Sequence, residues 1–392
     1  MKWETIVTKD NSTVVFPDDW LLPHYYEALN ALFRIENALR VFVYIVLKSE
    51  FKEKWLDINI TSDDSAQSSI GRIAKQRMNQ TKRFAYLGYF VPCPLMYMTS
   101  GELIRIIVSD SYWKLFNAHF PGSKEIISNK LDEISSVRNA LAHFRPIKRD
   151  DIELIKQNAK HVLSMVETCI IQLMRCSDVV PTNTQDDWYK GLKLLGTDYS
   201  RLLFNQSDDG NWIKVSFVYN CPILDHSGYE FHRRYRALNL NTPAILQNFP
   251  RLQALLILLS ENTSYPFVKI EDTPDFQKSI IMVFRRDVIS AEYATIKQQI
   301  DNVLMKVAEE TRLLQGDNLA RGKLVHAVDI IADKKRSGDY WTFDVDGFIC
   351  RANENDPPEY WGQLNYVADN YITSTDQYPW MPVNVSEQII PF

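Results

Sequence analysis

The sequence predicts a protein of two domains, an all-α N-terminal half followed by an α+β or mixed α/β C-terminal half. Up to about residue 175 the apolar residues recur at helical spacing, whereas short runs rich in β-branched and aromatic residues appear beyond about residue 188. The 392 residues exceed the roughly 100–200 of one ordinary domain. Residues 177–187 (SDVVPTNTQDD) are polar and contain a proline, which is typical of a linker. We therefore predict domains at 1–177 and 188–392.

Five helical segments are expected in the first domain. The segment 24–48 has apolar residues at helical spacing after Pro23, and a segment at about 66–87 carries the basic residues Lys75, Arg77, Lys82 and Arg83. We interpret this basic run as a solvated face, with phosphate contact as the alternative. The other three helices are expected at 100–120, before Pro121, at 123–143, before Pro146, and at 151–174.

The second domain is expected to alternate between strands and helices. Runs with strand character lie at 211–219, 229–238, 265–270, 279–286 and 340–351. Helical patterns lie near 243–260, 291–314 and 318–336. This order predicts an α+β or mixed α/β fold, and the sequence alone leaves open whether the domain senses a signal, holds RNA or binds a partner.

Composition excludes several classes of protein. With 45% hydrophobic and 12% aromatic residues the chain is globular, and its net charge of -5 requires any nucleic-acid contact to come from a local basic patch. The five cysteines are scattered and include no CxxC pair, so neither a disulfide framework nor a zinc site is predicted. The N-terminus lacks a signal-like apolar region, and no apolar run reaches the roughly 18 residues of a membrane span. We expect a cytoplasmic protein with no cofactor and no membrane contact.

Two groups in the second half have a functional and a plainer interpretation. His326, Asp329 and Asp333 would share one helical face and could hold a metal, as could the carboxylates of Asp344 and Asp346. A solvated helix face and a hairpin turn at Asp346-Gly347 are the simpler explanations. We prefer them and predict no metal site.

The run 229–238 mixes cations with aromatic residues. Its cations are His232, Arg233, Arg234 and Arg236, and its aromatic residues are Tyr229, Phe231 and Tyr235. Such a strand could contact RNA. A strand edge protected by charge is the explanation we favour.

An arginine followed five positions later by a histidine occurs twice. Arg321 and His326 have this spacing in a predicted helix without supporting context. Arg138 and His143 lie at the C-terminal end of a long predicted helix, Asn139 follows the arginine, and Pro146 closes the segment. The surroundings of Arg138 and His143 therefore make this pair the candidate site.

The first half resembles the HEPN superfamily (higher eukaryotes and prokaryotes nucleotide-binding domain), whose members are small helical bundles. The residues that carry the resemblance are Arg138, Asn139, His143 and Pro146, Glu36 and Arg40 in LFRIENALRVF, and the stretch Leu95 to Phe120. The resemblance covers about residues 20–175 and is strongest over SSVRNALAHFRP. It implies a HEPN-like helical bundle. Many members are metal-independent endoribonucleases in which an arginine and a histidine act at a dimer interface.

The resemblance also implies roles for individual residues. Arg138 and His143 match the two catalytic positions, Asn139 matches the polar residue that often follows the arginine, and Glu36 matches a polar helper on an earlier helix more loosely. It further implies a bacterial toxin or antiphage defence effector, with RNA, a second copy of the chain, and an antitoxin, phage-derived trigger or partner protein as partners. Some HEPN toxins carry a tyrosine, modified by a partner nucleotidyltransferase, where this chain has Arg145, so that form of neutralisation is not expected.

The chemistry of RNA cleavage asks for the same residue types. Attack by the 2′-OH needs proton transfer, which a histidine performs near neutral pH, and stabilisation of charge on the phosphoryl oxygens, which a bidentate arginine supplies. Asn139 would orient the reacting groups by a hydrogen bond. Arg145, Lys148 and Arg149 would add positive charge that holds RNA.

Spacing on the helix indicates that one subunit is incomplete. Residues five apart on an ideal helix differ by about 140° in direction, so Arg138 and His143 would not share a small site within one chain. Pairing about a two-fold axis would gather two copies of each, which predicts a homodimer. The alternatives are that Arg138 pairs with Glu36 or Glu133 while His143 caps the helix, and that this half is a non-catalytic dimerisation or nucleotide-binding module with a C-terminal sensor or interaction domain.

Overall fold

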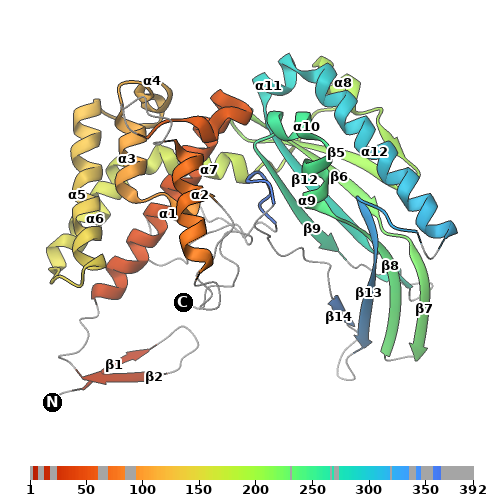
Figure 1. Cartoon of the computed structure of the whole chain (residues 1–392), viewed down its shortest axis with the longest axis horizontal. Helices are drawn as coiled ribbons and strands as arrows, with labels where there is room; N and C mark the ends of the chain where they lie inside the picture. Colours follow the sequence, from red (N-terminus) through yellow and green to blue (C-terminus); the bar gives the residue numbers. More distant parts are fainter. Residues whose placement is uncertain are drawn as a thin grey trace. The chain divides into compact units, whose positions relative to one another are not determined.

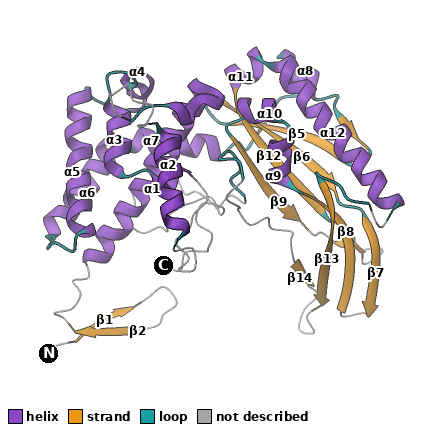
Figure 2. Cartoon of the chain, viewed as in Figure 1, coloured by secondary structure: helices purple, strands orange, loops and turns teal. Residues whose placement is uncertain are grey.

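The residue pattern changes from helical to strand-like along the sequence, and the computed structural model accordingly has two compact units. Among the described residues the boundary lies between Met174 and Arg175 (Figure 1). Helices make up most of the N-terminal unit, and antiparallel sheets dominate the C-terminal one (Figure 2). The predicted order of an α half and an α+β half is therefore confirmed. The structure describes residues 3–7, 13–17, 24–60, 69–83, 94–229, 232–264, 267–268, 273–317, 320–334, 341–345 and 356–362.

The helices of the N-terminal unit surround one long central helix. They are α1 (His24–Phe51), α2 (Ile70–Lys82), α3 (Ser100–Val108), α4 (Trp113–Phe116), α5 (Lys124–Ala142), α6 (Arg149–Val162) and α7 (Ser164–Met174), with short 3-10 turns at Lys52–Asp57, Pro94–Tyr97 and Asn117–His119. Helix α1 packs against α3, α5, α6 and α7. Most of its C-terminal half, including Phe42, Tyr44 and Leu47, is buried because neighbours cover it on several sides.

Sequence periodicity located these helices better than it located their ends. The helix expected at 100–120 is interrupted after Val108, and the one expected at 151–174 is broken at Leu163 into α6 and α7. The expectation that the first half is all helical is wrong at its start. There, β1 (Trp3–Val7) and β2 (Thr13–Pro17) form an antiparallel hairpin, whose β-branched residues favour strand over helix.

The predicted basic run on α2 is partly a structural element. The guanidinium of Arg77 binds both carboxylate oxygens of Glu102, at 2.7 and 2.6 Å. Glu102 also forms a capping box with Thr99 at the start of α3. Burial alone would raise the pKa of Glu102, but the hydrogen bonds from Arg77 and Thr99 outweigh it and lower that pKa. Arg77 therefore ties α2 to α3 instead of forming part of a free solvated face.

Two antiparallel sheets form the core of the C-terminal unit. The first has the order β3 (Asp178–Val179), β5 (Ser200–Gln206), β6 (Trp212–Asn220), β12 (Gln277–Arg285) and β9 (Leu258–Ser264), with β4 (Gly196–Thr197) beside β5. The second has the order β14 (Trp341–Val345), β13 (Val325–Lys334), β8 (His232–Leu240) and β7 (Ile223–Tyr229). A two-stranded ribbon pairs β10 (Phe267–Val268) with β11 (Thr273–Pro274). The strand expected at 229–238 is thus β8, an interior strand and not the sheet edge that we expected.

In the described part of the C-terminal unit, five helices accompany the two sheets. They are α8 (Asp187–Leu192), α9 (Thr242–Asn248), α10 (Pro250–Leu255), α11 (Arg286–Ala291) and α12 (Tyr293–Gly316). Helix α12 contacts α8, α10, α11 and β13. The expected helix at 243–260 is two short helices that meet at Phe249-Pro250, and the chain then enters β9.

The prediction of a helix at 318–336 is wrong, because the strand β13 occupies Val325–Lys334. The run VHAVDIIADK places buried residues at alternate positions, and β8 and β14 pair with it on both sides. The buried carboxylate of Glu310 on α12 accepts hydrogen bonds from the backbone N–H groups of Leu324 and Val325, at 2.7 and 3.0 Å. This contact fixes the start of the strand, and no feature of the local sequence announces it.

A short segment near the C-terminus covers the outer edge of β9. The backbone N–H of Leu259 donates to the carbonyl of Glu359 at 2.7 Å, and the N–H of Trp361 donates to the carbonyl of Leu259 at 2.8 Å. Tyr360 and Leu259 form a parallel bridge. The segment 359–361 is buried and closes this edge of the first sheet. Within the described ranges, none of the helices combines the length and apolar character that a membrane crossing requires.

Gly322, just before β13, offers a test of this packing. A Cβ atom at this position would lie 2.2 Å from the carbonyl oxygen of Val325 and 2.7 Å from Oε2 of Glu310, two atoms that are fixed by the strand and by the buried carboxylate. Gly322→Ala should therefore lower the free energy of unfolding by about 1–3 kcal/mol in urea denaturation. The matched control is Gly316→Ala, whose Cβ meets nothing within 4 Å and which should lose no stability. Equal stability of the two variants would contradict the described contact.

Candidate functional site

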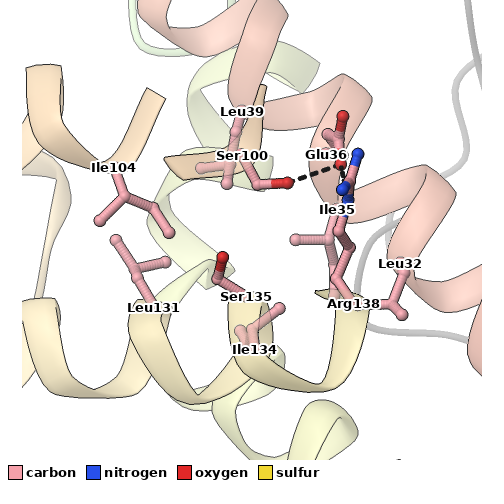
Figure 3. A pocket seen from close by; sticks show the side chains of 10 residues that line it. All are labelled: Leu32, Ile35, Glu36, Leu39, Ser100, Ile104, Leu131, Ile134, Ser135 and Arg138. Carbon is pink, nitrogen blue, oxygen red and sulfur yellow. Dashed lines mark hydrogen bonds and ion pairs between the residues drawn. The ribbon is translucent and has the colours of Figure 1, made fainter. Parts of the chain in front are cut away.

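The side chain of Arg138 lies between α5 and α1. Its Nε donates a hydrogen bond to Oε2 of Glu36 at 3.1 Å, with Arg138 35% and Glu36 12% exposed (Figure 3). Glu133, the other acid considered for Arg138, instead accepts a hydrogen bond from Nδ2 of Asn158 at 2.6 Å. The pairing of Arg138 with Glu36, which belongs to the non-catalytic alternative, is therefore present, and the pairing with Glu133 is not.

Glu36 gathers residues from three helices. Its Oε2 also accepts a hydrogen bond from the hydroxyl of Ser100, at the start of α3, at 2.6 Å (Figure 3). Its Oε1 forms an ion pair with Arg40 one turn further along α1. One carboxylate thus faces two guanidinium groups, and the cluster keeps an excess of one positive charge.

Arg40 is held firmly enough to be a fixed part of this cluster. Its Nε and Nη2 donate to the carbonyl oxygen of Met98 at 3.1 and 3.0 Å, and its Nη1 donates to Oδ1 of Asn37 at 2.6 Å. With the ion pair to Glu36, these contacts engage all three nitrogens of the guanidinium. Arg40 therefore serves as the counterion that orients Glu36.

Arg138 differs from Arg40 in what its terminal nitrogens do. Within the described part of the chain, Nη1 and Nη2 of Arg138 form no hydrogen bond or ion pair, because Glu36 binds only Nε. The side chain borders a pocket with an empty volume of about 280 Å³, open space at its mouth included. The pocket is lined by Leu32, Ile35, Glu36, Leu39, Ser100, Ile104, Leu131, Ile134, Ser135 and Arg138 (Figure 3). A charged group with two unused donor nitrogens stands beside a largely apolar wall.

His143 occupies the C-cap position of α5 and is exposed. Its backbone N–H donates to the carbonyl of Asn139 at 3.1 Å, whereas its imidazole forms no hydrogen bond to any residue that the structure describes. Asn139 is exposed as well. Arg138 and His143 share no hydrogen bond, so one chain does not join the two groups into a single constellation.

The chain leaves α5 through a Schellman motif. The N–H of Phe144 donates to the carbonyl of Leu141 at 3.0 Å, and the N–H of Arg145 donates to the carbonyl of Ala140 at 2.9 Å. In this motif the residue that follows the C-cap must adopt a positive φ, so this position is usually a glycine. Here it is Phe144, with φ of 55°. The left-handed conformation costs an L-residue roughly 1–2 kcal/mol, so the stop of α5 is strained.

The three basic residues predicted to bind RNA follow this stop. Arg145, Lys148 and Arg149 are all exposed, and Ile147 between them is buried. The hydroxyl of Tyr25 donates to the carbonyl of Arg145 at 3.4 Å and accepts from the N–H of Ile147 at 3.1 Å. The basic loop, defined as residues 143–149, is thereby attached to the start of α1.

The second arginine and histidine pair is not built as a site. Arg321 lies in the loop before β13, and His326 lies on that strand, opposite Asn239 of β8. Burial and the charge of Lys278 lower the pKa of His326, which favours its neutral form. The two arginine and histidine pairs therefore lie in different environments although their spacing in the sequence is the same.

The metal hypotheses also fail where the structure can test them. On a strand, His326 and Asp329 point to opposite faces, so the proposed helical set does not exist. Among the described residues no three His, Cys, Asp or Glu side chains gather in a way that could hold a metal ion. Asp344 lies on β14, while Asp346 and Gly347 lie outside the described residues.

Two of the four cations of β8, His232 and Arg236, face acidic residues on the exposed side of the second sheet. His232 contacts Asp333 through Nδ1 at 2.5 Å, and Arg236 stands opposite both Asp225 of β7 and Asp329 of β13 in the strand register. Arg233 lies over the ring of Trp341, 5.1 Å from its centroid. The positive charge of the strand is therefore largely balanced within the sheet.

Ser100 is the site residue that sequence reasoning missed. The sequence predicts only that Ser100 begins a helix, and nothing in the sequence links it to Glu36, which lies on another helix. The nearest signal is the capping pattern Thr99 to Glu102, which fixes where α3 begins and hence where the hydroxyl of Ser100 lies.

Comparison of the chain with models of known protein families, with curated proteins and with solved structures finds no match.

The role of Glu36 can be tested through stability. Glu36→Gln should lower the free energy of unfolding by about 1–3 kcal/mol, because it removes the anion that separates the guanidinium groups of Arg40 and Arg138. Urea denaturation measures the change. The matched control is Glu50→Gln on the same helix, an exposed position where no loss is expected. An unchanged free energy in Glu36→Gln would mean that the carboxylate does not hold the three helices together.

Proposed function

We propose that this chain is a metal-independent endoribonuclease of the HEPN type, which cuts RNA through attack of the RNA's own 2′-OH on the neighbouring phosphorus. The observation that carries the proposal is the state of Arg138, held at Nε by Glu36 with both terminal nitrogens unused among the described residues. A guanidinium fixed in this way offers two parallel N–H groups, the arrangement that binds two phosphate oxygens. Arg138 would hold the phosphate and stabilise the charge that grows on it.

His143 would transfer the proton. Its imidazole is exposed and is not used by any described contact, so it is available to a substrate at the end of α5. A histidine can accept and return a proton near neutral pH, which the 2′-OH attack and the departure of the 5′-oxygen both need. Asn139, one residue after Arg138 and also exposed, would orient the reacting groups by a hydrogen bond.

We assign Glu36 a positioning role instead of a catalytic one. Both of its oxygens are already occupied, by Arg40 on one side and by Ser100 and Arg138 on the other. It would act through Arg138 by fixing the direction of the guanidinium. The hydrogen bond between them supports this role, because it uses the one nitrogen of Arg138 that a bidentate phosphate would leave free.

The active form would be a homodimer. Arg138 turns toward α1, His143 lies five positions further on, and the two do not share a hydrogen bond within one chain. A two-fold axis near the end of α5 would bring two arginines and two histidines to one cleft. The basic loop of each copy, with Arg145, Lys148 and Arg149, would then supply the charge that holds RNA.

The C-terminal unit would sense a signal or bind a partner rather than hold RNA. Asp225, Asp329 and Asp333 share the exposed face of its second sheet with His232, Arg234 and Arg236, and this balance does not favour a polyanion. Together with the resemblance of the N-terminal half, this suggests a toxin or antiphage effector acting in the cytoplasm. An antitoxin or a phage-derived trigger would be the partner.

Cleavage of purified total RNA in the presence of EDTA tests the catalytic roles. Arg138→Ala and His143→Ala should each reduce cleavage by at least about 100-fold, because general acid–base catalysis and charge stabilisation each contribute at this scale. Arg321→Ala and His161→Ala, at an exposed arginine and an exposed histidine outside the site, should cut like wild type. The catalytic proposal fails if the two site variants cut as fast as wild type. It also fails if wild type leaves RNA intact in every condition; RNA or nucleotide binding without cleavage would then support the non-catalytic module.

Mixing of inactive variants tests the composite site. Arg138→Ala and His143→Ala should be inactive when pure, whereas mixed dimers retain one intact arginine and one intact histidine, so an equimolar mixture should recover part of the wild-type cleavage. Light scattering should give a dimeric mass at micromolar concentration. A monomeric mass would rule out the dimer. No recovery from a mixture whose subunits are shown to exchange would rule out sharing of the site.

A further inference from the structure

An exposed aromatic ring stands directly beside the candidate catalytic histidine. Phe144 is 94% exposed, the largest exposure among the large hydrophobic side chains that the structure describes. Its backbone is in the left-handed region, with φ of 55°. A glycine would fit this position without strain and without exposing an apolar ring. The sequence therefore keeps a ring in water at a position where both the backbone and the solvent disfavour it.

The ring is carried by a well-anchored backbone. Two Schellman hydrogen bonds fix Phe144 and Arg145 to the last turn of α5. Pro146 restricts the next φ angle, and Ile147 is buried beneath the loop. Tyr25 binds the backbone of residues 145 and 147 on the other side. Phe144 thus projects from a preorganised loop, which reduces the entropy that a ligand would have to remove.

Three cations follow the ring in the sequence. Arg145, Lys148 and Arg149 are exposed, and their side chains form no ion pair within the described ranges. In the described part of the loop and of α6, the carboxylate of Asp151 does not pair with these cations. It accepts a hydrogen bond from the backbone N–H of Lys148 at 2.7 Å and so stabilises the loop. An aromatic ring beside unpaired cations is the combination that single-stranded nucleic acids bind, with the ring against a base and the cations against phosphates.

We infer that Phe144 is a stacking platform for an unpaired nucleobase of single-stranded RNA at the end of α5, one residue after His143. This inference rests on the proposed function for the identity of the polymer. A duplex keeps its bases stacked inside, so the platform would select unpaired segments of RNA as the substrate class. It would do so without regard to sequence, because every base has a flat face.

A protein partner fits these features less well. Docking surfaces for proteins are contiguous apolar patches of several hundred Å². The residues on either side of Phe144 are His143 and Arg145, both polar and exposed, and the other exposed side chains of the loop are Pro146 and two cations. One ring between charges matches the size and chemistry of one base with its flanking phosphates.

Binding to a single-stranded RNA oligonucleotide containing 2-aminopurine tests the inference in the full-length chain. All proteins carry His143→Ala, so cleavage cannot interfere. The fluorescence of 2-aminopurine should be quenched on binding, and adding Phe144→Ala should abolish the quenching and raise Kd by about 5- to 100-fold. Phe144→Trp should preserve both. The matched control is Ile126→Ala at the other end of α5, 49% exposed, which should change neither.

Two further readouts separate stacking from charge and from folding. Phe144→Ala should leave the salt dependence of Kd unchanged, whereas Arg145→Ala should reduce its slope by about one unit or less. Phe144→Gly should raise the thermal midpoint, because glycine accepts the positive φ, and should still lose the quenching. A better-folded protein that binds worse would exclude misfolding as the cause of the loss.

The outcomes distinguish this inference from the proposed function. Quenching and a Kd that do not depend on Phe144 overturn the stacking role even if wild type cuts RNA. A Phe144→Ala protein that binds RNA normally but loses its dimeric mass overturns it in favour of a contact between two copies. If RNA binding depends on Phe144 but the wild-type protein cuts no RNA, the stacking role is supported and the ribonuclease proposal is excluded. Wild type that neither binds nor cuts RNA removes both.

Discussion

The carboxylate of Glu36 is the interaction on which the candidate site depends. It joins α1 to α3 through Ser100 and to α5 through Arg138, while Arg40 neutralises it from its own helix. Without this anion two guanidinium groups would approach each other at a half-buried position, which is unfavourable in a medium less polarisable than water. The direction of Arg138, and hence the two N–H groups that it offers, follows from this arrangement.

The two arginine and histidine pairs of the chain show how far surroundings decide the meaning of a short pattern. Arg138 and His143 flank the end of a helix, where side chains reach solvent and the backbone turns sharply. Arg321 precedes a strand whose first amides are held by Glu310, and His326 is partly buried against β8. The spacing is the same, but only the first environment leaves an arginine and a histidine open to a ligand.

Much of the helical half was predictable because several of its helices bury one face, and the resulting period of 3.6 is visible in the sequence, as with Ile127, Leu131 and Ile134 of α5. The strand β13 was mistaken for a helix because a short apolar run is ambiguous by itself and the deciding contact, Glu310, lies on another element. At the site, Arg138, His143 and Glu36 were named from the sequence. Ser100 was not, because only the folded chain brings a helix start beside a carboxylate so distant in sequence.

The segment that covers β9 has a consequence for how the chain is made. Leu259 pairs with residues 359–361, so synthesis passes through a long interval in which β9 and β12 can already pair while the outer edge of β9 still has no cover. An open strand edge accepts backbone hydrogen bonds from any extended chain nearby. Until residues 359–361 have left the ribosome, the outer edge of β9 can therefore pair with another extended chain, so this edge is a site of possible misassembly during synthesis.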